Sequence, residues 1–144
     1  LITCIYEEQI ESVLLENARD LVQVVGTIDL DDDGHPKRIT DVQEVHAVNV
    51  DDIDVIELLP ANLKPNELNN LRVKVELSED KQTYFAALPE LGIEVAAYTR
   101  PDLISSLEAE IGFLWKNIAM EDDSSLAAKA RDLKAKLNKL FVEI

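Results

Sequence analysis

The sequence Leu71-Arg-Val-Lys-Val-Glu-Leu77 alternates apolar and charged residues without a break. Successive side chains of a β-strand point to opposite faces of a sheet, so this pattern predicts a strand with one buried face. Turn-forming residues follow at 78–81, and apolar stretches at 84–88 and 93–98 predict two further strands. This part of the chain is therefore expected to form a small antiparallel sheet whose apolar face needs a cover.

Two amphipathic helices are predicted after this sheet, separated by a polar break at 121–124. Thr99 is a favourable N-cap, and Asp102 three residues later resembles a capping box with Asp in place of Glu. The first helix carries apolar residues at intervals of three and four: Leu103, Leu107, Ile111, Leu114 and Ile118. The second repeats them as a heptad-like seam: Leu126, Ala130, Leu133, Leu137, Leu140 and Ile144. The seam is suited to packing on the preceding helix or on a partner's copy.

The first half of the chain predicts a separate module. We expect a strand, a helix, a second strand, a polar turn and a third strand, at 1–6, 7–18, 21–28, 29–36 and 39–50. Acidic residues, prolines and asparagines at 51–70 indicate a linker with a short strand at 53–58. The predicted fold class is therefore α+β, with two small antiparallel sheets or hairpin modules and a C-terminal helical hairpin. The predicted domains are 1–50 and 71–144, joined by the linker.

The formal net charge of the 144-residue chain is -15. Residues 1–70 hold 16 acidic and 4 basic side chains, whereas residues 71–144 hold 13 acidic and 10 basic ones, so the excess lies in the first half. Such a field repels a phosphate backbone and attracts a basic protein. No apolar run approaches the roughly 20 residues of a membrane span, and the start does not read as a signal peptide. With a single cysteine, which excludes an internal disulfide, a cytoplasmic protein is expected.

Few side chains in the sequence could carry out catalysis. Cys4, His35 and His46 are the candidate nucleophile, bases or soft metal ligands, and no spacing motif joins them. A lone cysteine on a strand is usually a small buried hydrophobe. The four glycines are scattered, so no phosphate-binding loop is present. We therefore expect no enzyme activity and no cofactor.

The turn Asp29-Leu-Asp31-Asp-Asp33-Gly34 resembles the first half of an EF-hand calcium loop. Asp29, Asp31 and Asp33 would be the metal ligands. The second half departs from the pattern, because Thr40 stands where a bidentate Glu is needed and the flanks predict strands rather than helices. A hairpin turn is the favoured interpretation, with a weak calcium site as the alternative.

The C-terminal helices supply the candidate residues for binding a partner protein. Trp115 on an amphipathic helix is expected in the core, and an interface anchor is the alternative. The other candidates are the seam leucines Leu126, Leu133, Leu137 and Leu140. The last helix also carries five basic residues, for which a solvated face is favoured over a contact with nucleic acid or with the acidic first half.

The segment Val73 to Ile118 resembles the HicB-like antitoxin domain. The resemblance rests on Tyr84-Phe-Ala86-Ala-Leu-Pro89-Glu-Leu91-Gly92, a third strand, and then Thr99 and the amphipathic helix. It implies a partial ribonuclease-H-like sheet with one helix, and a role in blocking small basic ribonuclease toxins. The chain departs from the family at Ile93 to Tyr98, where HicB usually has Gly or Cys and then Gly, and it lacks the usual DNA-binding tail.

Residues 1–50 resemble a recurrent bacterial module of a strand, a helix and a hairpin. The matching residues are Val22 to Ile28, Gly34, Pro36, Ile39, Val42 and Val45. In similar examples one or two strands precede the first strand seen here, and without them Ile2 to Tyr6 would be an open sheet edge.

The sequence therefore predicts a non-enzymatic, antitoxin-like interaction protein that binds a basic partner protein. The alternatives are a structural homodimerisation domain held by the helical seam and a weak calcium-binding domain. Membrane binding is not expected, and nucleic-acid binding is disfavoured by the charge.

Overall fold

The computed structural model describes residues 3–4, 21–66 and 71–144. The chain divides into two compact units, Leu1–Asn49 and Val50–Ile144. The helix expected at 7–18 lies outside the described residues. The α+β class is confirmed, because several small sheets are followed by two C-terminal helices.

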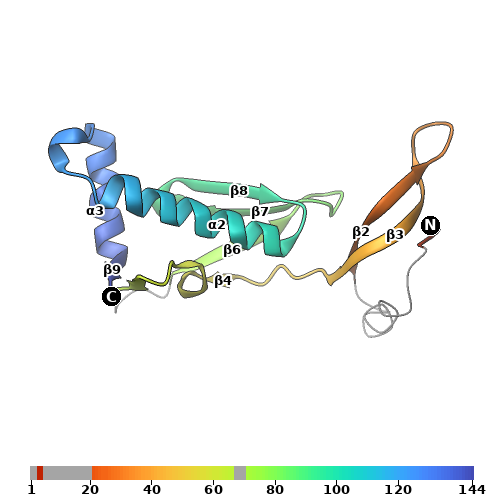
Figure 1. Cartoon of the computed structure of the whole chain (residues 1–144), viewed down its shortest axis with the longest axis horizontal. Helices are drawn as coiled ribbons and strands as arrows, with labels where there is room; N and C mark the ends of the chain where they lie inside the picture. The colour runs from red at the N-terminus through yellow and green to blue at the C-terminus, as the bar shows by residue number, and fades with distance from the viewer. Residues whose placement is uncertain (1–2, 5–20, 67–70) are drawn as a thin grey trace. The chain divides into compact units, whose positions relative to one another are not determined.

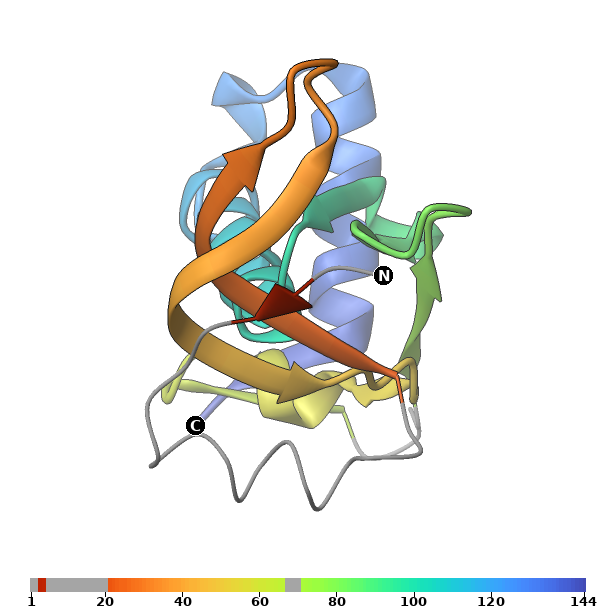
Figure 2. The same ribbon diagram turned by 90° about the vertical axis from the view of Figure 1, so that its right-hand side faces the viewer.

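The first unit contains a three-stranded sheet in the order β1-β3-β2. Strands β2 (Val22–Leu30) and β3 (Pro36–Ala47) form a twisted antiparallel hairpin (Figure 2). The short β1 (Thr3–Cys4) lies parallel to β3, with Cys4 opposite Ile39. This sheet is therefore mixed, not purely antiparallel as expected from the sequence, because β1 adds to the hairpin from outside it.

A bulge interrupts the hairpin next to Gly26. The pairing runs from Val25 with Glu44 to Thr27 with Thr40, so Gly26 faces a longer stretch of β3. Asp41 in that stretch has a φ of 51°. A Cβ atom at Gly26 would lie 3.0 Å from the Asp41 carbonyl oxygen and 3.1 Å from that of Thr40. The bulge therefore requires glycine at this position because the backbone of β3 approaches closely.

The second unit is built on a four-stranded antiparallel sheet in the order β4-β6-β7-β8 (Figure 1). Its strands are β4 (Ile53–Asp54), β6 (Arg72–Leu77), β7 (Tyr84–Leu88) and β8 (Ile93–Ala97). Alternate residues on one face are buried, as the alternating sequence of β6 predicts. A 3-10 turn, η2 (Pro89–Leu91), joins β7 to β8 and ends at Gly92, whose φ is 66°.

Helix α2 (Arg100–Leu114) covers the apolar face of this sheet. Thr99 Oγ1 accepts a hydrogen bond from the Asp102 N–H at 3.2 Å, so the expected N-cap is present. Leu103, Leu107 and Ile111 on the helix are fully buried, as are Val73 and Leu88 of the sheet. The helix continues as a π-helical turn, η3 (Trp115–Ala119), in which the Met120 N–H donates to the Trp115 carbonyl oxygen.

The segment expected to be a linker instead forms part of the second unit. After β4 it contains the 3-10 helix η1 (Val55–Leu58) and strand β5 (Leu63–Pro65). Four of its apolar side chains are buried in the core: Ile53, Val55, Leu58 and Leu63. Prolines and charged residues are compatible with short elements of this kind, so composition alone did not distinguish them from a linker.

The last helix ends earlier than the heptad pattern predicts. After the 3-10 turn η4 (Asp123–Ser125), helix α3 spans Ala128–Leu140 and is followed by strand β9 (Phe141–Glu143). Strand β9 pairs with β5, and the Ile144 N–H donates to the Asn62 carbonyl oxygen at 2.9 Å. Ile144 is therefore not a member of the helical seam and is 80% exposed. The reason is that strand pairing buries Phe141 and satisfies the backbone beyond the helix end.

Candidate interaction surfaces

The end of the β2-β3 hairpin carries the densest group of carboxylates among the described residues of the first unit. We call residues 27–38 the acidic hairpin; Asp29, Asp31, Asp32 and Asp33 lie in it, with Lys37 and Arg38 as its basic residues. Asp31, Asp32 and Asp33 are exposed. Ile28 and Leu30 are also exposed, by 53% and 60%. Apolar side chains that are exposed beside charged residues are a feature of protein-binding surfaces.

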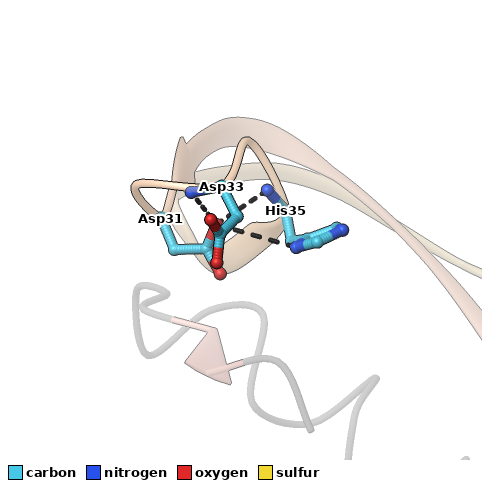
Figure 3. A group of neighbouring side chains, drawn as sticks. All are labelled: Asp31, Asp33 and His35. Atoms are coloured by element: carbon cyan, nitrogen blue, oxygen red, sulfur yellow. Dashed lines mark hydrogen bonds and ion pairs between the residues drawn. The ribbon is translucent and has the colours of Figure 1, made fainter.

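The turn of the acidic hairpin is stabilised by hydrogen bonds to the side chain of Asp31 (Figure 3). Asp31 Oδ1 accepts hydrogen bonds from the N–H groups of Asp33 at 3.0 Å and His35 at 2.9 Å. The Gly34 N–H donates to the Asp31 carbonyl oxygen, and Gly34 has a φ of 81°, which glycine tolerates without strain. The turn therefore holds its carboxylates on a fixed backbone.

The predicted calcium ligands do not all converge. Asp31, Asp33 and His35 each offer an atom within 4.8 Å of the others, and all three residues are exposed. Asp29 instead bonds through Oδ2 to Arg38 Nε at 2.6 Å across the hairpin. An imidazole nitrogen in place of the third carboxylate is a poor match to calcium, which prefers oxygen ligands. The grouping is produced by the Asx turn rather than by the EF-hand spacing.

The candidate catalytic residues are spread along the first unit. His35 precedes β3 and His46 lies near its other end, where its Nε2 atom is 2.8 Å from Glu44 Oε2. Cys4 lies on β1, opposite Ile39 in the register. The structure therefore does not bring the two histidines together.

The seam of α3 packs inside the second unit, against η3. Leu137 is fully buried, whereas Leu133 and Leu140 are partly exposed. Leu126, also partly exposed, was expected in the helical seam but has extended backbone and precedes α3, because the η4 turn ends at this residue. Trp115 is 7% exposed, as the core interpretation expects. Two of the five interface candidates, Trp115 and Leu137, therefore contribute to the core of the folded chain, and the other three lie at its margin.

Trp115 is also held by a polar contact that the sequence did not indicate. Its Nε1–H donates to Glu143 Oε1 at 3.3 Å, joining the π-helical turn to β9. A hollow of about 330 Å³ lies beside this pair, lined by residues that include Met120, Asn138 and Phe141. The contact depends on β9, which the predicted continuous helix would not have formed.

The basic residues of α3 are mostly solvated. Lys129, Arg131, Lys136 and Lys139 are exposed. Lys134 is the exception: its Nζ atom lies 3.0 Å from Asp123 Oδ1 and donates to the Glu121 carbonyl oxygen. Lys134 therefore ties the break between the helices to α3.

The outer face of the four-stranded sheet, turned away from α2, was not singled out by the sequence. Phe85 is 45% exposed on it and lines a groove of about 420 Å³ formed by β6, β7, β8 and the η2 turn. The signal was present in the sequence, because Phe85 occupies an outward position between the buried Tyr84 and Ala86.

Comparisons of the chain with protein-family models, with curated proteins and with solved structures found no match. None of the helices in the described part of the chain has both the length and the apolar character that spanning a bilayer requires.

Proposed function

We propose that this protein is a non-enzymatic, cytoplasmic interaction module that binds a basic partner protein in the manner of an antitoxin. The observation that carries the proposal is the acidic hairpin, where exposed carboxylates on a hydrogen-bonded turn lie in the same hairpin as the exposed side chains of Ile28 and Leu30. Carboxylates held on a rigid turn lose little freedom when a cationic surface approaches.

The two kinds of side chain would act at different stages of binding. The negative field of the first unit raises the rate of encounter with a basic protein, because charge complementarity acts over distances up to the Debye length. Burial of Ile28 and Leu30 then slows dissociation, because apolar area removed from water is lost again when the complex separates.

The arrangement of the second unit supports the antitoxin-like part of the proposal. Strands β6, β7 and β8 followed by α2 have the order that the resemblance to HicB implies. The resemblance implies a target among small basic ribonuclease toxins. An acidic protein is suited to such a target and repels the RNA that the target binds.

The first experiment identifies the partner by affinity capture of the full chain from its native cells, followed by mass spectrometry. A basic protein is expected among the captured proteins. The purified pair is then studied by stopped-flow binding at several salt concentrations.

The decisive variant is Asp32→Asn/Asp33→Asn, which removes two exposed charges and leaves the Asp31 turn intact. We expect its association rate to fall severalfold at low salt, with a weaker salt dependence and little change in dissociation. Glu108→Gln/Glu110→Gln is the matched control, because it removes two exposed charges from α2. Equal association rates for the two variants would exclude the acidic hairpin as the binding site.

A second variant tests the apolar part of the surface. Ile28→Ser/Leu30→Ser should raise the dissociation rate and leave the association rate nearly unchanged. The reverse pattern would show that these side chains do not lie in the interface.

A further inference from the structure

The outer face of the second unit carries the exposed aromatic side chain of Phe85, and charged residues of the neighbouring strands line the same groove. On β7, Phe85 and Ala87 point away from α2. In the register of the sheet, Phe85 lies between Glu76 and Ala96, and Ala87 lies between Lys74 and Glu94. The groove of about 420 Å³ is lined by these residues apart from Ala96.

The charges on this face are separated by sign except at Glu76. Arg72 and Lys74 are on β6, and Glu94 is on β8 with Glu90 in the adjoining η2 turn. Glu76 lies at the far end of β6 and is 3.1 Å from Lys74. Both side chains of that ion pair are more than half exposed, so it constrains Lys74 only weakly. Around Ala87, basic residues on β6 and acidic residues on β8 and η2 therefore lie on opposite sides of β7, and Glu76 is the acidic exception on β6.

We propose that two copies of this chain associate through their outer faces, about a two-fold axis that runs along β7. A rotation about this axis places β6 of one copy over β8 of the other. Lys74 of each copy then faces Glu94 of its partner, and the two Phe85 rings meet on the axis. The interface is self-complementary, as a two-fold interface must be.

The charges select this axis over the alternative in the same plane. An axis perpendicular to the strands would place Lys74 over Lys74 and Glu94 over Glu94 if it crossed the row of Ala87, and Glu76 over Glu76 if it crossed the row of Phe85. Like charges in contact are unfavourable. Two aromatic rings that meet on the axis can offset or tilt to pack edge to face. The face lies in the second unit, so the inference does not rest on the acidic hairpin or on the proposed partner.

Sedimentation velocity of the full chain over a range of concentrations tests the proposal. We expect a concentration-dependent dimer for the natural sequence. Lys74→Glu should abolish it, because the changed residue would face Glu94. Glu94→Lys should also abolish the dimer, because Lys74 would then face a second positive charge.

The strongest test mixes the two single variants. In a heterodimer of Lys74→Glu with Glu94→Lys, both facing pairs carry opposite charges, so the equimolar mixture should sediment as a dimer although each variant alone is monomeric. Recovery in the mixture also shows that both variants are folded.

Control substitutions lie outside the outer face. Lys129→Glu and Glu108→Lys reverse charges on the exposed surfaces of α3 and α2 and should leave the dimer unchanged. Asp32→Asn/Asp33→Asn should also leave it unchanged, which separates this proposal from the acidic hairpin. Phe85→Ser should weaken the dimer at least tenfold.

Three results would overturn the proposal. They are a natural chain that stays monomeric at millimolar concentration, single variants that dimerise like the natural chain, and a mixture that remains monomeric. The second result would assign the dimer to another surface, such as the helical seam.

Discussion

Trp115 Nε1 donates a hydrogen bond to Glu143 Oε1 at 3.3 Å, and this contact joins the end of the α2 segment to the last strand of the chain. The indole ring is buried, whereas Glu143 is exposed. The buried donor is therefore satisfied by a residue at the surface, far away in the sequence.

Glu143→Ala should lower the free energy of unfolding of the second unit by about 0.5–1.5 kcal/mol, because the Trp115 N–H loses its acceptor. Trp115 is the one tryptophan of the chain, so urea denaturation followed by its fluorescence reports this unit. Glu110→Ala, an exposed position on α2, is the control and should change stability little. An unchanged midpoint for Glu143→Ala would show that the contact contributes nothing in solution.

Tyr84→Phe should preserve or raise the stability of the second unit. Tyr84 is 1% exposed, and its hydroxyl has no hydrogen-bond partner within the described part of the chain. A buried hydroxyl without a partner costs about 1–3 kcal/mol, so its removal is expected to be neutral or stabilising by about 1 kcal/mol. The measurement is again urea denaturation by fluorescence. A loss of more than about 1 kcal/mol would reveal a favourable interaction of the hydroxyl.

Gly26→Ala should destabilise the first unit by about 1–3 kcal/mol, because its Cβ atom would approach backbone carbonyl oxygens of β3. Hydrogen exchange of the β2 and β3 amides measures this effect, since the tryptophan lies in the other unit. Gly112→Ala is the matched control. Its Cβ atom would meet Pro60 at an ordinary 3.8 Å, and alanine favours a helix by about 1 kcal/mol over glycine. The free energy of unfolding should therefore fall for Gly26→Ala and rise slightly for Gly112→Ala.

The turn after β6 should show a small pH dependence through Asp80. The hydrogen bond from the Ser78 hydroxyl, followed by that from the Gln82 N–H, lowers the pKa of the Asp80 carboxyl below its ordinary value of 3.8. A carboxyl whose pKa is lower in the folded state than in the unfolded state stabilises the fold at pH values above the unfolded-state pKa. This contribution disappears as the pH falls through the folded-state pKa.

Asp80→Asn should therefore be less stable than the natural chain near neutral pH, and the two curves should converge below pH 3.8. Thermal unfolding at several pH values compares them. Curves that stay parallel down to acid pH would indicate that the carboxylate charge plays no part.

Calorimetric titration with calcium should give no saturable heat. Asp29, the first residue of the EF-hand-like pattern, is bonded to Arg38, and Asp31 Oδ1 already accepts two backbone hydrogen bonds. The natural chain should be compared with an Arg38→Gln variant, in which the Asp29 carboxylate is released from its ion pair and becomes available as a ligand. Saturable heat for the natural chain that is lost in Asp31→Asn would establish a metal site at the turn.

Local patterns in the sequence predicted the regular elements well. Alternation at 71–77 matches β6, and Thr99 caps α2 as expected. These features depend on neighbours within a few residues, and backbone periodicity and capping act at that range. The turn at Asp29 to Gly34 was also predicted from such local features. However, the group of possible metal ligands at this turn contains His35 in place of the expected Asp29.

The sequence by itself determined the α+β class, the alternating strands, the helix cap and the acidic first half of the chain. Only the tertiary structure decided that 53–65 belongs to the core, that Phe141 leaves the helix to pair with β5, and that Phe85 lies exposed between Glu76 and Ala96. The physical reason is that pairing between distant strands, and the burial that accompanies it, outweighs the local preference of short segments, whose own periodicity carries too little free energy to fix their structure.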